Sequence, residues 1–131
     1  MSENLERVRD SARILLAGIR IFNGAVALFA PQLMASRFKD NPNSAVIYAL
    51  RLFGVRTIII GIDLLLPDEE ARAHALRYAI PIHASDTASA ALAGKQGHLP
   101  KSVSIMLTAL SGFNTVLAIL AQPCKDERGT R

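Results

Sequence analysis

Four long apolar segments, separated by residues that break helices, constrain this chain more than any other feature. The segments run over residues 12–30, 44–66, 73–93 and 102–121. Each is about 19 to 23 residues long, and a helix of about 20 apolar residues crosses the hydrocarbon core of a bilayer. Prolines follow three of the segments, and a glycine-containing loop follows the other. We therefore predict an all-α fold, an antiparallel four-helix transmembrane bundle with short loops, forming one domain over residues 1–131 with a flexible tail over 122–131.

The composition leaves a soluble helical bundle as an alternative. Half of the residues are hydrophobic, a fifth are charged, and the mean hydropathy of +0.26 is low for a protein with four spans. A helix in a soluble bundle, however, needs one polar face. Residues 25–30 and 57–62 are apolar all round. The membrane-embedded bundle is therefore the favoured fold.

The distribution of cationic residues predicts the orientation. The net charge is +4, but the Lys and Arg residues lie mainly at the ends of the apolar segments and are not interleaved with aromatic residues, so we expect no nucleic-acid partner. With four spans, eight Lys and Arg residues lie on the side of the two termini and four on the other. The positive-inside rule then places both termini in the cytoplasm, with the protein in the bacterial plasma membrane.

Charged residues near the middle of the segments are the candidate functional feature. Arg20, Arg56 and Asp86 lie close to the centres of three different segments. Residues 44–66 contain roughly thirteen strongly apolar residues against Arg51, Arg56 and Asp63. Each central charge costs about 2.5–3.5 kcal/mol on insertion and each large apolar residue returns about 0.3–0.6, so the two contributions nearly cancel. These charges should therefore face the interior of the bundle.

The central polar residues have two interpretations. The candidate cluster consists of Arg20, Asn23, Arg56, Asp63, His83 and Asp86. In the first interpretation, Arg20 and Arg56 form ion pairs with Asp86 and Asp63 that fix helix register. In the second, the cluster lines a partly cationic cavity for an anionic or carbonyl-bearing amphiphile, such as a fatty acid, a lipid head group or a quinone. No metal site is expected, because no second ligand lies at helical spacing from His83.

Small and hydroxyl-bearing residues form a second group, which we assign to helix packing. Gly54 and Gly61 lie seven residues apart, roughly opposite the charged face, where small residues allow close helix approach. The last segment carries a row of hydroxyl groups at Ser104, Thr108, Ser111 and Thr115. The sequence around Arg20 also resembles that around Arg56, which is either a small inverted repeat or a chance similarity between apolar segments.

Two short motifs resemble a known group of proteins. Residues 51–56, Arg-Leu-Phe-Gly-Val-Arg, are followed by Gly61, and residues 86–90 read Asp-Thr-Ala-Ser-Ala. Over residues 12–121 the chain resembles small four-helix bacterial membrane proteins, often actinobacterial, that are similar in style to the DoxX-like family. The resemblance implies a four-helix membrane fold. It also implies contact with a quinone, because DoxX-like proteins include membrane subunits of quinone-linked oxidoreductases, but no residue here matches a quinone ligand.

The sequence contains no cofactor motif, metal-ligand cluster or catalytic constellation, which favours a non-enzymatic protein. Our first functional hypothesis is an accessory or assembly subunit of a larger membrane complex, acting through a protein partner or as a homo-oligomer. The alternative is a membrane-embedded binder, or redox partner, of a small amphiphile held at mid-depth. No cofactor is required by either hypothesis, although a bound lipid or quinone is compatible with the second.

Overall fold

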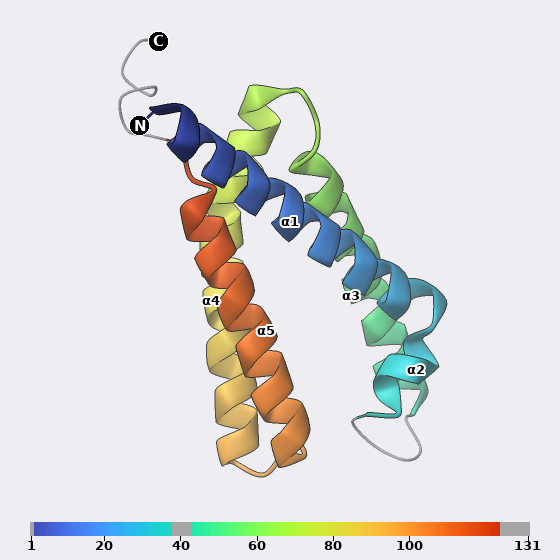
Figure 1. Cartoon of the computed structure of the whole chain (residues 1–131). Helices are drawn as coiled ribbons and strands as arrows, with labels where there is room; N and C mark the ends of the chain where they lie inside the picture. Colours follow the sequence, from blue (N-terminus) through green and yellow to red (C-terminus); the bar gives the residue numbers. More distant parts are fainter. Residues whose placement is uncertain (1, 38–42, 124–131) are drawn as a thin grey trace.

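The computed structural model describes residues 2–37 and 43–123, and these residues form helices and their connections without any strand. In chain order the helices are α1 (Ser2–Phe29), α2 (Pro31–Ala35), α3 (Ser44–Asp63), α4 (Glu69–Lys95) and α5 (Lys101–Leu120). The expectation of an all-α fold is confirmed. Four helices are long, and neighbouring long helices run in opposite directions (Figure 1). The short helix α2 was not expected from the sequence.

Local chemistry sets several helix ends. The side chain of Asn43 caps α3 by accepting a hydrogen bond from the backbone N–H of Val46 at 3.0 Å. Asp68 caps α4 in the same way, with its Oδ1 2.9 Å from the N–H of Glu70. Pro31 begins α2, where the first turn of a helix needs no N–H donor.

The helices differ in length from the apolar segments. Helix α1 begins at Ser2, ten residues before the apolar segment at 12–30. Its charged first turns belong to the same helix, and the ion pair between Asp10 and Arg13, at 3.2 Å, supports them. Helix α4 extends beyond residues 73–93 at both ends, and α3 ends at Asp63 rather than residue 66. Of the tail at 122–131, only residues 122 and 123 are described.

Helices α1 and α3 form a close antiparallel pair around glycine (Figure 1). A Cβ atom added to Gly54 would lie 2.6 Å from the carbonyl oxygen of Gly24, and one added to Gly24 would lie 2.8 Å from that of Gly54. A Cβ on Gly61 would lie 3.2 Å from the carbonyl oxygen of Ala17. The packing face predicted at Gly54 and Gly61 therefore lies against α1.

Helices α4 and α5 form the second antiparallel pair. The hydroxyl of Ser104 donates to the carbonyl oxygen of Ala90 at 2.8 Å, and Ser104 packs directly against Gly94. At the other end of the pair, the amide Nε2 of Gln122 donates to the carbonyl oxygen of Leu76 at 2.8 Å. Hydrogen bonds thus join α4 to the α5 segment at both ends.

The two pairs meet at one end of the molecule and separate towards the other (Figure 1). Where they meet, a small core brings together the beginnings of α1 and α4 with the ends of α3 and α5. It consists of Ala12, Leu16, Ala17, Leu64, Ala75, Leu76, Ala79, Leu117, Ala118 and Ala121. Elsewhere α3 and α4 make few contacts with each other.

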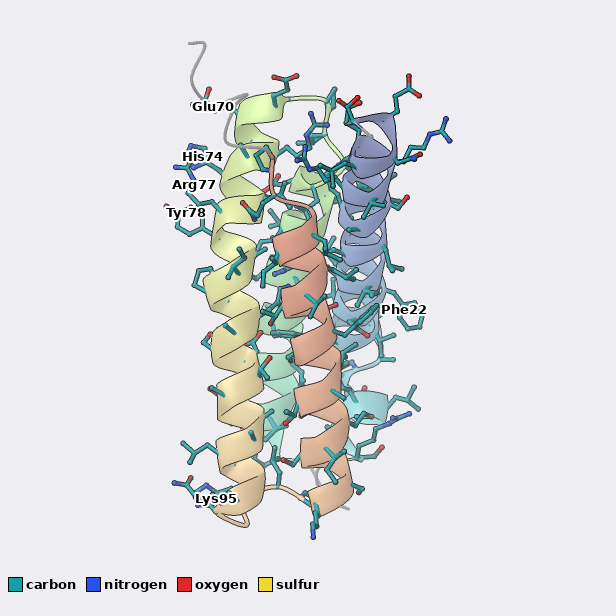
Figure 2. All side chains as sticks on the ribbon, turned by 60° about the vertical axis from the view of Figure 1, so that its left-hand side comes forward. Phe22, Glu70, His74, Arg77, Tyr78 and Lys95 are labelled. Carbon is teal, nitrogen blue, oxygen red and sulfur yellow. The ribbon has the colours of Figure 1, made fainter. Side chains whose placement is uncertain are left out.

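Three of the described helices, α1, α3 and α5, are long and apolar enough to cross a membrane, whereas α4 is not. The sequence had suggested four such segments. The third segment differs because its middle carries His83, Ser85 and Asp86 among small alanines. The apolar helices leave large side chains exposed on their outer surfaces, including Phe29, Ile59, Ile105, Val116 and Ile119. Phe22, which is also exposed, projects from α1 in Figure 2 and is one of the residues that line the space between the helix pairs.

Candidate functional site

A cleft of about 650 Å³ lies between the two helix pairs. Its volume falls within the range of roughly 300–1,000 Å³ that small-molecule sites occupy. Its wall is mostly apolar and is built from α1, α2, α3 and α5, with Val26, Leu33, Met34, Leu50, Phe53, Leu107 and Leu110 among the lining residues. Its polar lining comes mainly from the middle of the long helices. The cleft therefore combines an apolar wall with a localised polar region.

Arg20 is the central polar residue of this cleft. It lies on α1, is 4% exposed, and its Nη1 forms a hydrogen bond with Nε2 of His83 on α4. Since a guanidinium has only donors, Nε2 of His83 must be the acceptor, and His83 is neutral with its proton on Nδ1. The Nε atom of Arg20 is buried and has no hydrogen-bond partner. Arg20 therefore retains an unused donor.

Arg56 on α3 and Asp86 on α4 also line the cleft. Both are exposed to the space between the pairs, and the charges of both act on Arg20, attractively from Asp86 and repulsively from Arg56. Within residues 2–37 and 43–123, however, no ion pair within 4.0 Å joins Arg20 or Arg56 to Asp86 or Asp63. The geometry brings Arg20, Arg56 and Asp86 to one cleft without pairing them directly.

Two asparagines and a serine on α1 and α5 also belong to the polar region. Asn23 on α1 and Ser111 on α5 line the cleft. Asn114 on α5 also lines it, is 6% exposed, and has a side-chain oxygen without a hydrogen-bond partner. An asparagine amide can be turned to present either its oxygen or its NH₂ group. Asn114 therefore offers a buried polar group to whatever occupies the cleft.

Asp63 is the one residue of the predicted cluster that lies elsewhere. It lines a second cavity of about 470 Å³ between α3 and α4, together with Arg56, His74 and Tyr78. The rings of His74 and Tyr78 are stacked, with centroids 6.4 Å apart. Arg56 lines both cavities. The five other predicted residues, Arg20, Asn23, Arg56, His83 and Asp86, share the first cleft.

The four hydroxyl-bearing residues of the row on α5 have different roles, since some take part in helix packing and one lines the cleft. Ser104 bonds across to α4, as described above, and Thr115 donates to the carbonyl oxygen of Ser111 in its own helix at 2.8 Å. The hydroxyl oxygen of Thr108 is buried without a partner. Of the row, only Ser111 lines the cleft. The row is therefore not a single site.

Sequence reasoning missed three features of the cleft. It placed His83 and Arg20 in one cluster but did not predict the hydrogen bond between them, and it did not include Asn114 among the candidate site residues. It also missed the contact at 3.5 Å between Nη1 of Arg37 and the sulfur of Met106, which joins the α2 end of one pair to α5. The sequence did not single out the residues of the apolar wall, because large apolar side chains occur on most sides of these segments.

The described residues contain no group of three or more His, Cys, Asp or Glu side chains that could hold a metal ion. No family model, no curated protein and no solved structure matches the chain. The resemblance to DoxX-like proteins therefore stays a prediction, and the functional argument rests on the geometry of the cleft.

Proposed function

We propose that this chain is an integral membrane protein that binds a small anionic or carbonyl-bearing amphiphile in the cleft between its helix pairs. The observation that carries the proposal is Arg20, a buried guanidinium that lines a mostly apolar cleft and has no carboxylate within 4.0 Å among residues 2–37 and 43–123. The polar end of the amphiphile lies at Arg20 and Arg56. Its tail lies along the apolar wall at Leu50, Phe53 and Leu107.

The free energy of burying Arg20 supports an occupant. A buried charge without a directly paired counter-ion costs several kcal/mol. The neutral His83 supplies one hydrogen bond but no opposite charge, and Asp86 attracts Arg20 only from beyond ion-pair distance. An anion, or a carbonyl oxygen with its partial negative charge, would satisfy the remaining accessible donor of the guanidinium. The apolar wall would be covered by the tail of the same molecule, which is why an amphiphile fits better than a small soluble anion.

In the proposed arrangement all four long helices lie in the bilayer. The apolar side chains on the outer surfaces of α1, α3 and α5 contact lipid. Helix α4 is included because it packs along α5 and directs His83 into the cleft. The distribution of Lys and Arg supports an orientation with both ends of the chain in the bacterial cytoplasm.

A quinone remains one candidate for the carbonyl-bearing amphiphile, as the DoxX-like resemblance implies. The absence of a catalytic constellation in the sequence supports a role in binding or transfer rather than chemistry on the ligand. A redox partner role would require the bound molecule itself to carry the electrons.

Two experiments test the proposal. Membranes containing the protein are washed with alkaline carbonate, and the protein should stay in the pellet until detergent is added. The purified protein in mild detergent is then analysed by native mass spectrometry, which should show one co-purified amphiphile on the wild type. Arg20→Met keeps much of the side-chain volume but removes the charge, and should lose that adduct.

Arg77→Met is the matched control, because Arg77 lies on the outward side of α4 and does not line the cleft (Figure 2). It should retain the adduct. Release by carbonate alone would refute the membrane assignment. An amphiphile retained equally by wild type and Arg20→Met would refute the assignment of its polar end to Arg20.

A second function is favoured by the outward surface of α4, which we propose as the contact with a partner subunit of a larger complex. Its middle exposes the small residues Ala84, Ala88 and Ala91 rather than large apolar side chains, and small residues are typical of helix contacts in membranes. Cysteines placed at position 88 should form cross-links to a partner protein in native membranes. Cysteine at position 59, on the outward apolar surface of α3, is the control and should form none.

A further inference from the structure

We infer that the cleft selects an amphiphile with a single negative charge on its head group, and that Asp86 sets this preference. The inference rests on the proposed function, because it assumes that the cleft holds an amphiphile. It goes further by naming the charge of the head group and the residue that determines it.

The charges around the polar region add up to one positive charge. Arg20 and Arg56 contribute two positive charges and Asp86 one negative charge. His83 contributes none, since its Nε2 accepts the hydrogen bond from Arg20. Arg37 also lines the cleft, but it lies beyond α2, is exposed, and contacts the sulfur of Met106, so it is not counted with the charges around Arg20.

A head group with one negative charge therefore neutralises the cluster. A neutral head group leaves the positive charge uncompensated, and a head group with two negative charges leaves an excess negative charge. Both are unfavourable where water is scarce, because charge interactions strengthen as the effective dielectric constant falls. Without Asp86 the same cluster would carry two positive charges and would favour a doubly charged head group.

The hydrogen bonds of Arg20 leave one accessible donor of the guanidinium for the ligand. Nη1 is used by His83, and Nε is buried without a partner among the described residues, out of reach of a ligand oxygen. Nη2 has no hydrogen bond within residues 2–37 and 43–123 and can donate to an oxygen of an anionic group. A carboxylate and a phosphodiester both offer two oxygens and one negative charge, so either a free fatty acid or a glycerophospholipid has the required chemistry.

The test measures binding of four probes to the purified wild-type protein. Palmitate, hexadecanol and hexadecyl phosphate have the same chain length and carry one, no and mostly two negative charges at pH 8. Phosphatidylglycerol in nanodiscs, with one negative charge and two chains, is the fourth. Palmitate should bind at least about tenfold more tightly than hexadecanol or hexadecyl phosphate. Competition by phosphatidylglycerol would identify a phospholipid as the source of the charge, and its failure to compete would identify a free fatty acid.

Asp86→Asn then tests the residue that sets the preference. The ratio of palmitate to hexadecyl phosphate affinity should fall at least about tenfold in this variant. Asp68→Asn is the matched control, since it removes the same charge 18 residues earlier on α4, roughly 27 Å away along the helix. Its affinity ratio should equal that of the wild type. The elution profile in size-exclusion chromatography checks that each variant is folded.

The possible failures are distinguishable. Equal binding of palmitate and hexadecanol by the wild type would overturn the inference while leaving the proposed binding function in place. An unchanged affinity ratio in Asp86→Asn would overturn the role of Asp86. Failure of every probe to bind the wild type would overturn the proposed function, and the inference with it.

Discussion

The glycine contact between α1 and α3 gives a prediction whose sign follows from backbone geometry. In Gly54→Ala the new methyl group would lie 2.6 Å from the carbonyl oxygen of Gly24 and 2.7 Å from the backbone nitrogen of Leu28. Ordinary contacts of a Cβ atom begin at about 3.4 Å. Both neighbours are backbone atoms, so no side chain can rotate away. The two helices must separate by several tenths of an ångström.

A substitution at a second glycine isolates the free-energy cost of overpacking at Gly54. Gly18 lies on α1 and a Cβ added to it meets nothing within 4 Å. Replacing a helical glycine with alanine stabilises the helix by about 1 kcal/mol in both variants. The difference between Gly54→Ala and Gly18→Ala therefore reports the cost of overpacking alone, which is about 1–3 kcal/mol. Gly54→Ala should be the less stable variant by that amount.

Thermal stability in detergent is a suitable assay, measured as the fraction of protein that stays monodisperse in size-exclusion chromatography after heating. Gly18→Ala should match or exceed the wild type, and Gly54→Ala should lose several degrees relative to Gly18→Ala. Gly112→Ala, whose nearest neighbour is a methyl carbon of Thr87 at 3.9 Å, should behave like Gly18→Ala. Equal midpoints for Gly54→Ala and Gly18→Ala would refute the close contact between α1 and α3.

Two further predictions concern hydrogen bonds and are checked in the same assay. Ser104→Ala should destabilise the protein by about 0.5–1.5 kcal/mol, because it removes the hydrogen bond from α5 to the carbonyl oxygen of Ala90. Ser85→Ala is the control. Its stability should stay within about 0.5 kcal/mol of wild type, because the hydrogen bond of Ser85 is exposed and lies within its own helix. Equal effects of the two would contradict the α4–α5 packing. Asp68→Ala should lower the stability by about 1 kcal/mol, because it removes the N-terminal cap of α4. Asp68→Asn should lower it much less, because asparagine also caps helices. A large loss of stability in both variants would show that the charge of Asp68 matters rather than the cap.

The helices could be predicted from the sequence because their ends depend on local chemistry. The prolines and the caps at Asn43 and Asp68 act within a few residues of where they stand. The beginning of α1 was misplaced because the length of an apolar segment indicates how much of a helix can lie in a membrane, and not where the helix begins. Helix α4 was counted as a span because residues 73–93 have the length of a span and lie between helix-breaking residues, although α4 is not apolar enough to cross a membrane.

The candidate site could be predicted in outline and not in detail. Charges at similar depth on three helices indicated a shared interior, and Arg20, Arg56 and Asp86 do line one cleft. The rotation of each helix about its axis is set by tertiary packing. Arg56 and Asp63 lie almost on one face of α3, yet Asp63 lines only the second cavity while Arg56 lines both. That division, and the hydrogen bond from Arg20 to His83, depend on how the helices pack.

The most direct test of the account is photo-crosslinking of a palmitate analogue with a diazirine in the middle of its chain, added to vesicles that contain the protein. If the head group binds at Arg20, label should appear at cleft residues such as Leu50, Phe53 and Leu107, and should be lost in Arg20→Met. Label confined to outward residues such as Ile59, and unchanged by Arg20→Met, would contradict the central claim that this cleft holds an amphiphile.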